Sequence, residues 1–192
     1  MKKIVILASG EGTNARAIME HFDKHKSLSV AAVICNRIEA GVYRHAAAFG
    51  VPSFHITKEE IGQGNLENTL RGIQPDLIVL AGFMVKIPEN IIAAFSGKIV
   101  NIHPSLLPKF GGKGMYGKRV HEAVIEAGEQ ESGITVHLVN EQYDDGKILF
   151  QESIALTRDE TVDSLMEKVR KLEHDHYPLV IQRLLEQENS GE

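Results

Sequence analysis

Two polar residues, Asn101 and His103, stand two positions apart near the end of a segment that begins at Lys98 and is closed by Pro104. On an extended backbone this spacing places both side chains on one face and turns Ile102 to the other. Pro104 cannot donate to a sheet ladder, so it ends the strand. An amide beside an imidazole suits a reaction in which a carbonyl oxygen becomes an oxyanion. The alternative interpretation is a buried histidine that caps a strand end.

Two adjacent carboxylates form a second candidate segment, the turn Tyr143-Asp144-Asp145-Gly146. A carboxylate from this turn could approach the end of the strand that holds His103, orient the imidazole and raise its pKa. No serine or cysteine is obviously placed as a nucleophile, which favours direct attack by a substrate amine over a covalent acyl-enzyme. The alternative is a solvated turn, or a local turn closed by its own aspartate.

A glycine-rich turn near the N-terminus, Ser9-Gly10-Glu11-Gly12-Thr13-Asn14, joins a predicted strand to a predicted helix. Free backbone N–H groups and the helix dipole make such a turn an anion site. The glycine spacing fits neither a dinucleotide-binding turn nor a nucleoside-triphosphate loop, so a lone phosphate on Gly12, Thr13 and Asn14 fits better. The alternative is a tight turn with a threonine or asparagine helix cap.

Apolar runs alternate with helical patterns along the chain, which predicts an α/β fold. We expect a Rossmann-like, mostly parallel sheet with helices on both faces and an antiparallel C-terminal addition. The segment 132–139 alternates and is expected to be a half-buried strand. Strands are predicted at 3–8, 28–35, 51–56, 76–82, 98–102, 132–139 and 147–156. Helices are predicted at 15–22, 40–49, 66–71 within the segment 58–73, 89–95 with Pro88 as first residue, 120–127, and from Thr161 onward, with a kink or break at Pro178 and a frayed polar tail after Gln187.

Bulk properties exclude several classes of function. The chain has 192 residues and a net charge of −5, without a basic run longer than two residues, so nucleic acid binding is not expected. The apolar runs are too short to span a membrane, and the N-terminal one is too short for a signal peptide. The single cysteine, Cys35, is expected in the core. These properties predict one domain over residues 1–192 in a cytoplasmic protein.

The motifs together resemble a known family. The run Asn101-Ile102-His103-Pro104-Ser105-Leu106-Leu107-Pro108 resembles the signature of the folate-dependent formyltransferases, whose companion aspartate lies in a loop similar to 143–146. The turn 9–14 resembles the phosphate loop of one branch of that family. The segment 80–84 resembles its folate-pocket strand and loop, and Glu173-His174 before Tyr177-Pro178 matches the same branch.

The resemblance implies a reaction and a set of roles. It implies formyl transfer from 10-formyltetrahydrofolate, as co-substrate and without a metal, to the amine of 5-phosphoribosylglycinamide, a step of purine biosynthesis. It further implies a monomer or homodimer that acts on small molecules. The implied catalytic residues are Asn101, His103 and Asp144. The implied acceptor-binding residues are Gly12, Thr13, Asn14, Arg170 and Glu173. The implied folate-binding residues are Met84, Val85, Lys86, Ile87, Asn101, Asn140, Glu141, Gln142, Tyr143 and Asp144.

The chain also departs from the family pattern. Val85 stands where the pattern has arginine, with the cation Lys86 one place later, and the loop 113–117 is unusually rich in glycine. His121 and His137 are interpreted as structural or surface residues. Two other functions stay open. One is a formyltetrahydrofolate deformylase or another formyl-folate transferase, and the other is a phosphosugar-binding module without catalysis.

Overall fold

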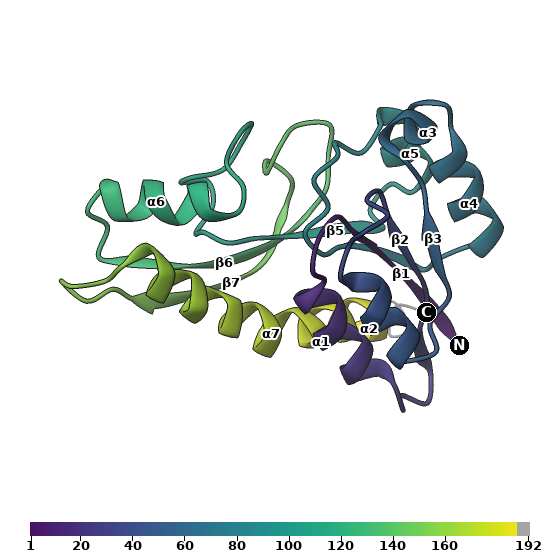
Figure 1. Cartoon of the computed structure of the whole chain (residues 1–192), viewed down its shortest axis with the longest axis horizontal. Helices are drawn as coiled ribbons and strands as arrows, with labels where there is room; N and C mark the ends of the chain where they lie inside the picture. Colours follow the sequence, from purple (N-terminus) through teal and green to yellow (C-terminus); the bar gives the residue numbers. More distant parts are fainter. Residues whose placement is uncertain (188–192) are drawn as a thin grey trace.

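The computed structural model describes residues 1–187, and its centre is a seven-stranded sheet (Figure 1). Five strands run parallel in the order β3-β2-β1-β4-β5, and β6 and β7 extend the sheet as antiparallel neighbours. The predicted mostly parallel sheet with an antiparallel C-terminal addition is therefore confirmed. The strands span Lys2–Ala8 (β1), Leu28–Cys35 (β2), Ser53–His55 (β3), Leu77–Leu80 (β4), Ile99–His103 (β5), Glu131–Leu138 (β6) and Ile148–Ala155 (β7).

The order of the strands reverses at β1. The chain proceeds from β1 to β2 and β3 on one side, then returns to place β4 on the other side of β1. In open α/β sheets such a reversal leaves a crevice beyond the carboxyl ends of the two strands, and ligands bind there. The loops that follow β1 and β4 are held together at this point, because the backbone N–H of Ser9 donates to the carbonyl of Gly82 at 3.1 Å.

Helices cover both faces of the sheet, as predicted. Ile4 and Ile6 of β1 belong to a core shared with α1, α2 and α7, whereas Val5 and Leu7 belong to a second core with α3, α4 and α5 (Figure 1). Within residues 1–187 no helix has both the length and the apolar character needed to cross a membrane. The helices span Thr13–Phe22 (α1), Val42–Ala48 (α2), Lys58–Gly62 (α3), Asn65–Ile73 (α4), Glu89–Ala94 (α5), Lys118–Glu126 (α6) and Val162–Gln187 (α7).

The segment 58–73 is more helical than predicted. It forms two helices, α3 and α4, where the sequence predicted only 66–71. The first helix is stabilised by a capping box, in which the Thr57 hydroxyl accepts from the N–H of Glu60 and the Glu60 carboxylate accepts from the N–H of Thr57. Gly64, with φ of 91°, then separates the two helices.

Pro88 lies one position earlier than predicted, and Pro178 lies inside the last helix as predicted but does not end it. Pro88 precedes α5 as its extended N-cap residue, with ψ of 146°, and is not the first helical residue. Pro178 lies inside α7, which continues through it, so the helix is not broken there. Tyr177 and Ile181 on either side of Pro178 are fully buried, and their packing holds both halves of α7 against the sheet. The predicted fraying after Gln187 lies outside the described residues.

Strand β6 is buried on both faces, where the alternating pattern predicted a half-buried strand. Its apolar residues face the core, while the face with Thr135 is covered by the segment after β5. The Thr135 hydroxyl donates to the carbonyl of Ser105 at 2.7 Å and accepts from the N–H of Leu107 at 3.0 Å. From the sequence alone such a polar face is predicted to be exposed to solvent, because the groups that bury it come from a distant segment of the chain.

Tyr177 connects α7 to the centre of the sheet and provides a test of the fold. Its side chain is 0% exposed, and its hydroxyl lies 3.0 Å from the carbonyl oxygen of Leu80 and 3.3 Å from that of Val100. We expect Tyr177→Phe to lower the free energy of unfolding by about 1–2 kcal/mol, because buried carbonyls lose a donor. Urea denaturation measures this change. Tyr116→Phe, at a side chain that is 51% exposed, should change it by less than about 0.5 kcal/mol, and equal effects would contradict the assignment.

Candidate active site

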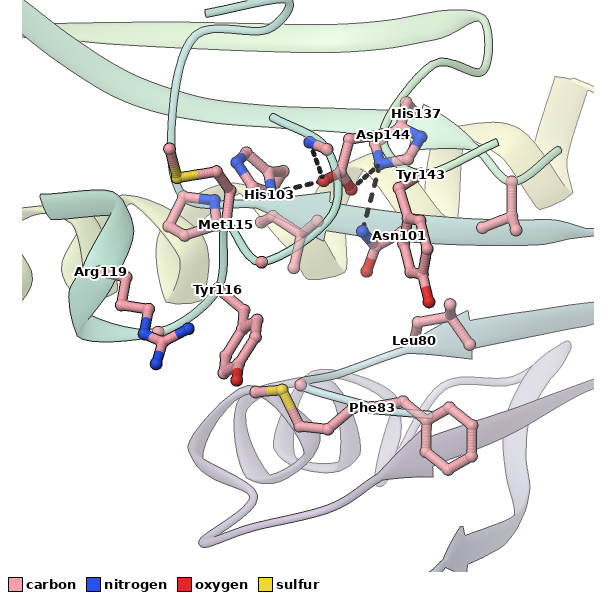
Figure 2. Close-up of a pocket in the computed structure, with 18 of the residues that line it drawn as sticks. Leu80, Phe83, Asn101, His103, Met115, Tyr116, Arg119, His137, Tyr143 and Asp144 are labelled. Atoms are coloured by element: carbon pink, nitrogen blue, oxygen red, sulfur yellow. Dashed lines mark hydrogen bonds and ion pairs between the residues drawn. The ribbon is translucent and has the colours of Figure 1, made fainter. Parts of the chain in front are cut away.

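A cavity of about 590 Å³ lies beyond the carboxyl ends of β4 and β5, and α7 and the turn between β6 and β7 close its sides (Figure 2). It contains polar residues from distant parts of the sequence, together with an apolar wall that begins at Leu80. Predicted site residues that line it are Asn14, Met84, Val85, Lys86, Ile87, Asn101, His103, Asn140, Gln142, Tyr143, Asp144, Arg170 and Glu173. Three predicted residues, Gly12, Thr13 and Glu141, are not part of its lining.

His103 is held between a carbonyl group and a carboxylate. It is the last residue of β5 and is buried, with its Nε2 atom 2.8 Å from the carbonyl oxygen of Phe110. A carbonyl only accepts, so Nε2 carries the proton and donates. The other ring nitrogen, Nδ1, lies 3.5 Å from Oδ2 of Asp144. The predicted approach of Asp144 to the imidazole is therefore confirmed.

The turn between β6 and β7 fixes the position of Asp144. The residue has a left-handed backbone conformation, with φ of 53°, and its Oδ2 accepts from the N–H of Gly112 at 2.9 Å. A Cβ atom at Gly146 would lie 1.7 Å from the carbonyl oxygen of Leu138, so only glycine fits there. The close approach of two backbone segments thus brings the carboxylate of Asp144 towards the end of β5.

Burial and charge act in opposite directions on this pair. Burial lowers the pKa of the His103 imidazole below its usual value, although the Asp144 charge raises it. The predicted effect of Asp144 on the imidazole pKa is therefore confirmed in direction, but burial, which the sequence does not show, outweighs it. Burial raises the pKa of the Asp144 carboxyl, but its neighbours His137 and His103 and the N–H of Gly112 together hold that pKa below its usual value.

His137 belongs to this cluster, although the sequence suggested a structural role. It stands directly opposite Asn101 in the antiparallel register of β5 and β6. Its Nε2 atom lies 3.1 Å from Nδ2 of Asn101 and 3.6 Å from Oδ1 of Asp144. Figure 2 shows Asp144 between the two imidazoles, with Asn101 beside His137. His137 and Asn101 are 36 positions apart in the sequence, so only the pairing of β6 with β5 could have predicted their contact.

A second polar group lies where α1 and α7 meet. The Nδ2 atom of Asn14 donates to Oε2 of Glu173 at 2.9 Å, while Oδ1 of Asn14 is buried without a partner among the described residues. Burial raises the pKa of Glu173 to about 7, against the opposing effects of Asn14 and Arg170. A neutral or half-ionised carboxyl beside an unpaired amide oxygen is suited to bind a polar ligand with hydroxyl or amine donors.

The turn before α1 can bind an anion through its backbone. Gly12 has φ of 76° and precedes the first helical residue, Thr13. A Cβ atom at Gly12 would lie 2.5 Å from Cγ2 of Val42, so a larger residue would displace the turn. The first N–H groups of α1 lack helical partners and point outward, which is the arrangement that binds phosphate. Gly12 and Thr13 therefore lie next to the cavity without lining it, beside the lining residue Asn14.

The loop after β4 forms the opposite wall of the cavity. Ile87 is buried and Met84 is 56% exposed, while the Lys86 ammonium lies 5.7 Å from the ring centroid of Tyr143 across the cavity mouth. Ser9 anchors this loop, because its hydroxyl accepts from the N–H of Met84 at 2.8 Å and donates to Oδ1 of Asn36 at 2.5 Å. The sequence did not single out Ser9 as the residue that connects the two loops of the crevice.

The glycine-rich loop after β5 also contributes to the lining. Lys113, Met115 and Tyr116 face the cavity, and the Arg119 guanidinium lies 5.5 Å from the Tyr116 ring centroid. His121, predicted to be structural, is buried in the lining, and burial lowers its pKa to about 4, so its ring is neutral near pH 7. The sequence showed that this loop is rich in glycine but not which of its side chains line the cavity.

Comparison with known proteins connects this geometry to a described family. The Formyl transferase family model matches residues 2–181. The chain is 40% identical over 193 residues to phosphoribosylglycinamide formyltransferase, chloroplastic, of Vigna unguiculata, covering 97% of this chain but only 62% of that relative. It is 38% identical over 199 residues to phosphoribosylglycinamide formyltransferase of Bacillus subtilis, covering 100% and 99%. The crystal structure of glycinamide ribonucleotide transformylase 1 from Geobacillus kaustophilus matches with a TM-score of 0.88 and 36% identity over 96% and 99% of the two chains.

The carboxyl group of Glu173 allows a test that needs no substrate. The folded protein holds this proton up to about pH 7, whereas its ordinary pKa is 4.5, so the native state loses stability as the pH rises between these values. Glu173→Gln has no such proton to lose. We therefore expect its melting temperature, relative to wild type, to be higher at pH 8 than at pH 5 by at least about 2–4 °C, the shift that 1 kcal/mol produces in a domain of this size.

The control for this measurement is Glu167→Gln, an exposed glutamate on the same helix. Its melting temperature relative to wild type should be the same at both pH values. A pH-independent difference for Glu173→Gln as well would show that burial does not hold the proton on this carboxyl.

Proposed function

The chain belongs to the formyl transferase family, and we propose that it transfers a formyl group from 10-formyltetrahydrofolate to the amine of 5-phosphoribosylglycinamide. The observation that carries the proposal is the contact between His103 and Asp144 inside a cavity that extends from the loop at Met84 to Asn14 and Glu173. Such a cavity has room for two co-substrates, one on each side of a shared reaction centre. The bacterial and plant relatives carry the name of this activity.

The reaction that suits this centre is direct attack of the amine on the formyl carbon. A C–N bond forms, the formyl oxygen becomes an oxyanion, and the bond from carbon to the folate N10 atom then breaks. The proton lost by the amine goes to N10, so the products are the formylated acceptor and tetrahydrofolate. No other reactant is needed, which agrees with a centre built from an amide, an imidazole and a carboxylate.

Asn101 and His103 are proposed to stabilise the oxyanion. In the charged imidazole of His103 Nδ1 carries a second proton. Because Nδ1 lies 3.5 Å from Oδ2 of Asp144, longer than a normal hydrogen bond, this proton can be donated to the formyl oxygen. Asp144 favours the charged imidazole, while burial makes that imidazolium a better proton donor than one in water. A water held by Asp144 is a second route for the proton that moves to N10.

The two ends of the cavity are proposed to separate the co-substrates. The phosphate of the acceptor would bind the N–H groups at Gly12, Thr13 and Asn14, and Glu173 with Arg170 would contact its glycinamide part. The pterin ring would lie between residues 84–87 and the turn at 140–144, largely against backbone groups. In that turn Asn140, Gln142, Tyr143 and Asp144 line the cavity, and Glu141 would contact the pterin through its backbone.

We propose further that residues 1–192 form a single formyltransferase domain in the cytoplasm. The domain would act on small molecules as a monomer or homodimer and use 10-formyltetrahydrofolate as co-substrate without a resident metal.

A panel of acceptors distinguishes the proposed reaction from its alternatives. The protein is mixed with 10-formyltetrahydrofolate and either 5-phosphoribosylglycinamide, another amine, or water alone, and the change in folate absorbance is followed. Turnover only with the glycinamide nucleotide supports the proposal. Turnover with water alone would indicate a deformylase, turnover with a different amine another formyl-folate transferase, and no turnover a binding module.

The role of His103 is tested by His103→Ala. We expect kcat to fall about 10²–10³-fold, with little change in KM for either substrate, because an oxyanion donor acts mainly in the transition state. Steady-state kinetics with both substrates measures both constants. The matched control is His55→Ala, at an exposed histidine of β3 on the far edge of the sheet, which should retain wild-type turnover. Near-wild-type kcat in His103→Ala would refute the role.

A further inference from the structure

The side chains of Asn101 and His137 meet because of strand register. The two residues are direct partners in the antiparallel pair of β5 and β6, so their side chains lie on the same face of the sheet. The Nδ2 atom of Asn101 lies 3.1 Å from Nε2 of His137, and both residues line the cavity (Figure 2). The contact is therefore part of the site, and it can influence which end of the Asn101 amide, oxygen or nitrogen, faces the cavity.

The backbone determines which nitrogen of His137 carries the proton. Its Nδ1 atom lies 2.9 Å from the carbonyl oxygen of Leu138, which can only accept, so Nδ1 must be the donor. In the neutral ring Nε2 is then an acceptor, and it can bind only the NH₂ group of the Asn101 amide. If the amide were rotated by half a turn, its oxygen would face the Nε2 lone pair at about the same distance, which is repulsive.

We propose that His137 is a positioning residue, which fixes the Asn101 amide in one of its two orientations. This inference rests on the proposed function, because the orientation matters only if the amide meets the reacting formyl group. One hydrogen of the amide NH₂ is bound by His137 and the second remains for the oxyanion. Fixing the amide before substrate arrives spares the reaction the cost of ordering it, which is how a preorganised donor accelerates a reaction.

Asp144 is the group that competes for His137. Its Oδ1 atom lies 3.6 Å from the same Nε2, and its Oδ2 atom is bound by Gly112 and faces His103. If His137 were protonated on both nitrogens, Nε2–H would donate to Asp144 or to the oxygen of a rotated Asn101 amide. The protonation state of His137 therefore decides whether Asn101 directs its nitrogen or its oxygen to this neighbour.

Nitrogen NMR of the wild-type protein tests the tautomer directly. With ¹⁵N-labelled histidine at pH 7, we expect the ring nitrogens of His137 to give one protonated signal at Nδ1 and one unprotonated signal at Nε2, assigned by comparison with His137→Gln. A ring protonated at Nε2, or at both nitrogens, would overturn the proposal. This measurement needs no turnover, so its result is distinguishable from a failure of the proposed function.

A double-mutant cycle tests the effect on the reaction. His137→Leu keeps much of the volume of the ring but offers no acceptor, and we expect kcat to fall about tenfold, the value of one hydrogen bond, with KM unchanged. His137→Gln should restore most of the loss, since its amide oxygen can accept from Asn101. In an Asn101→Ala background His137→Leu should have no further effect, because there is no amide left to orient.

Two outcomes of the cycle would overturn the inference. One is an equal loss from His137→Leu in the wild-type and Asn101→Ala backgrounds, which would show that His137 acts independently of Asn101. The other is wild-type kcat in His137→Leu. Circular dichroism and melting temperature verify that each variant folds, and His55→Leu is the control for an exposed histidine. If His137→Leu does not fold, His137→Gln and the NMR measurement still decide the question.

Discussion

The site depends on one buried carboxylate. Asp144 contacts His103, His137 and the N–H of Gly112, and these three groups come from β5, β6 and the loop after β5. A buried carboxylate without such neighbours would be protonated or would turn to water, since the desolvation of a charge costs several kcal/mol. The N–H of Gly112 donates to it, and the contacts with His103 and His137 also hold its pKa below the usual value. The turn between β6 and β7 must therefore bend sharply at Gly146 to bring it there.

Asp144 and Glu173 show how similar side chains acquire different charges within one cavity. Both are removed from water, yet the pKa of Asp144 is below its usual value and that of Glu173 is raised to about 7. The difference lies in the neighbouring groups. Asp144 has the N–H of Gly112 and two imidazoles beside it, whereas Glu173 is bound by the neutral amide of Asn14 and faces the cation Arg170 only through space. A charged carboxylate thus lies beside the reaction centre and a near-neutral one beside the proposed acceptor site.

Much of the fold could be predicted because the strands and helices follow from hydrophobic patterns within short segments of the sequence. The apolar runs gave all seven strands, and Asn101 and His103 fell at the end of β5 as the strand period required. The missed features are non-local. The ring of His137 acquires its role only through pairing with β5, β6 is buried by a segment after that strand, and the pKa of His103 depends on how completely other elements enclose it. The helix α3 was the exception, since Thr57 and Glu60 form a capping box that the sequence displays.

The reversal of strand order explains why these features can cooperate. It brings the loops after β1 and β4 together, where Ser9 binds the N–H of Met84 and fixes one wall relative to the phosphate turn. β5 lies on the other side of β4, so its Asn101 and His103 reach the space between those walls. Asn101 and His103 stand on a strand, whereas residues 84–87 of the opposite wall stand on a loop. That wall can therefore differ between relatives without moving Asn101 and His103. Replacing a strand residue such as His137 should therefore affect turnover more than binding.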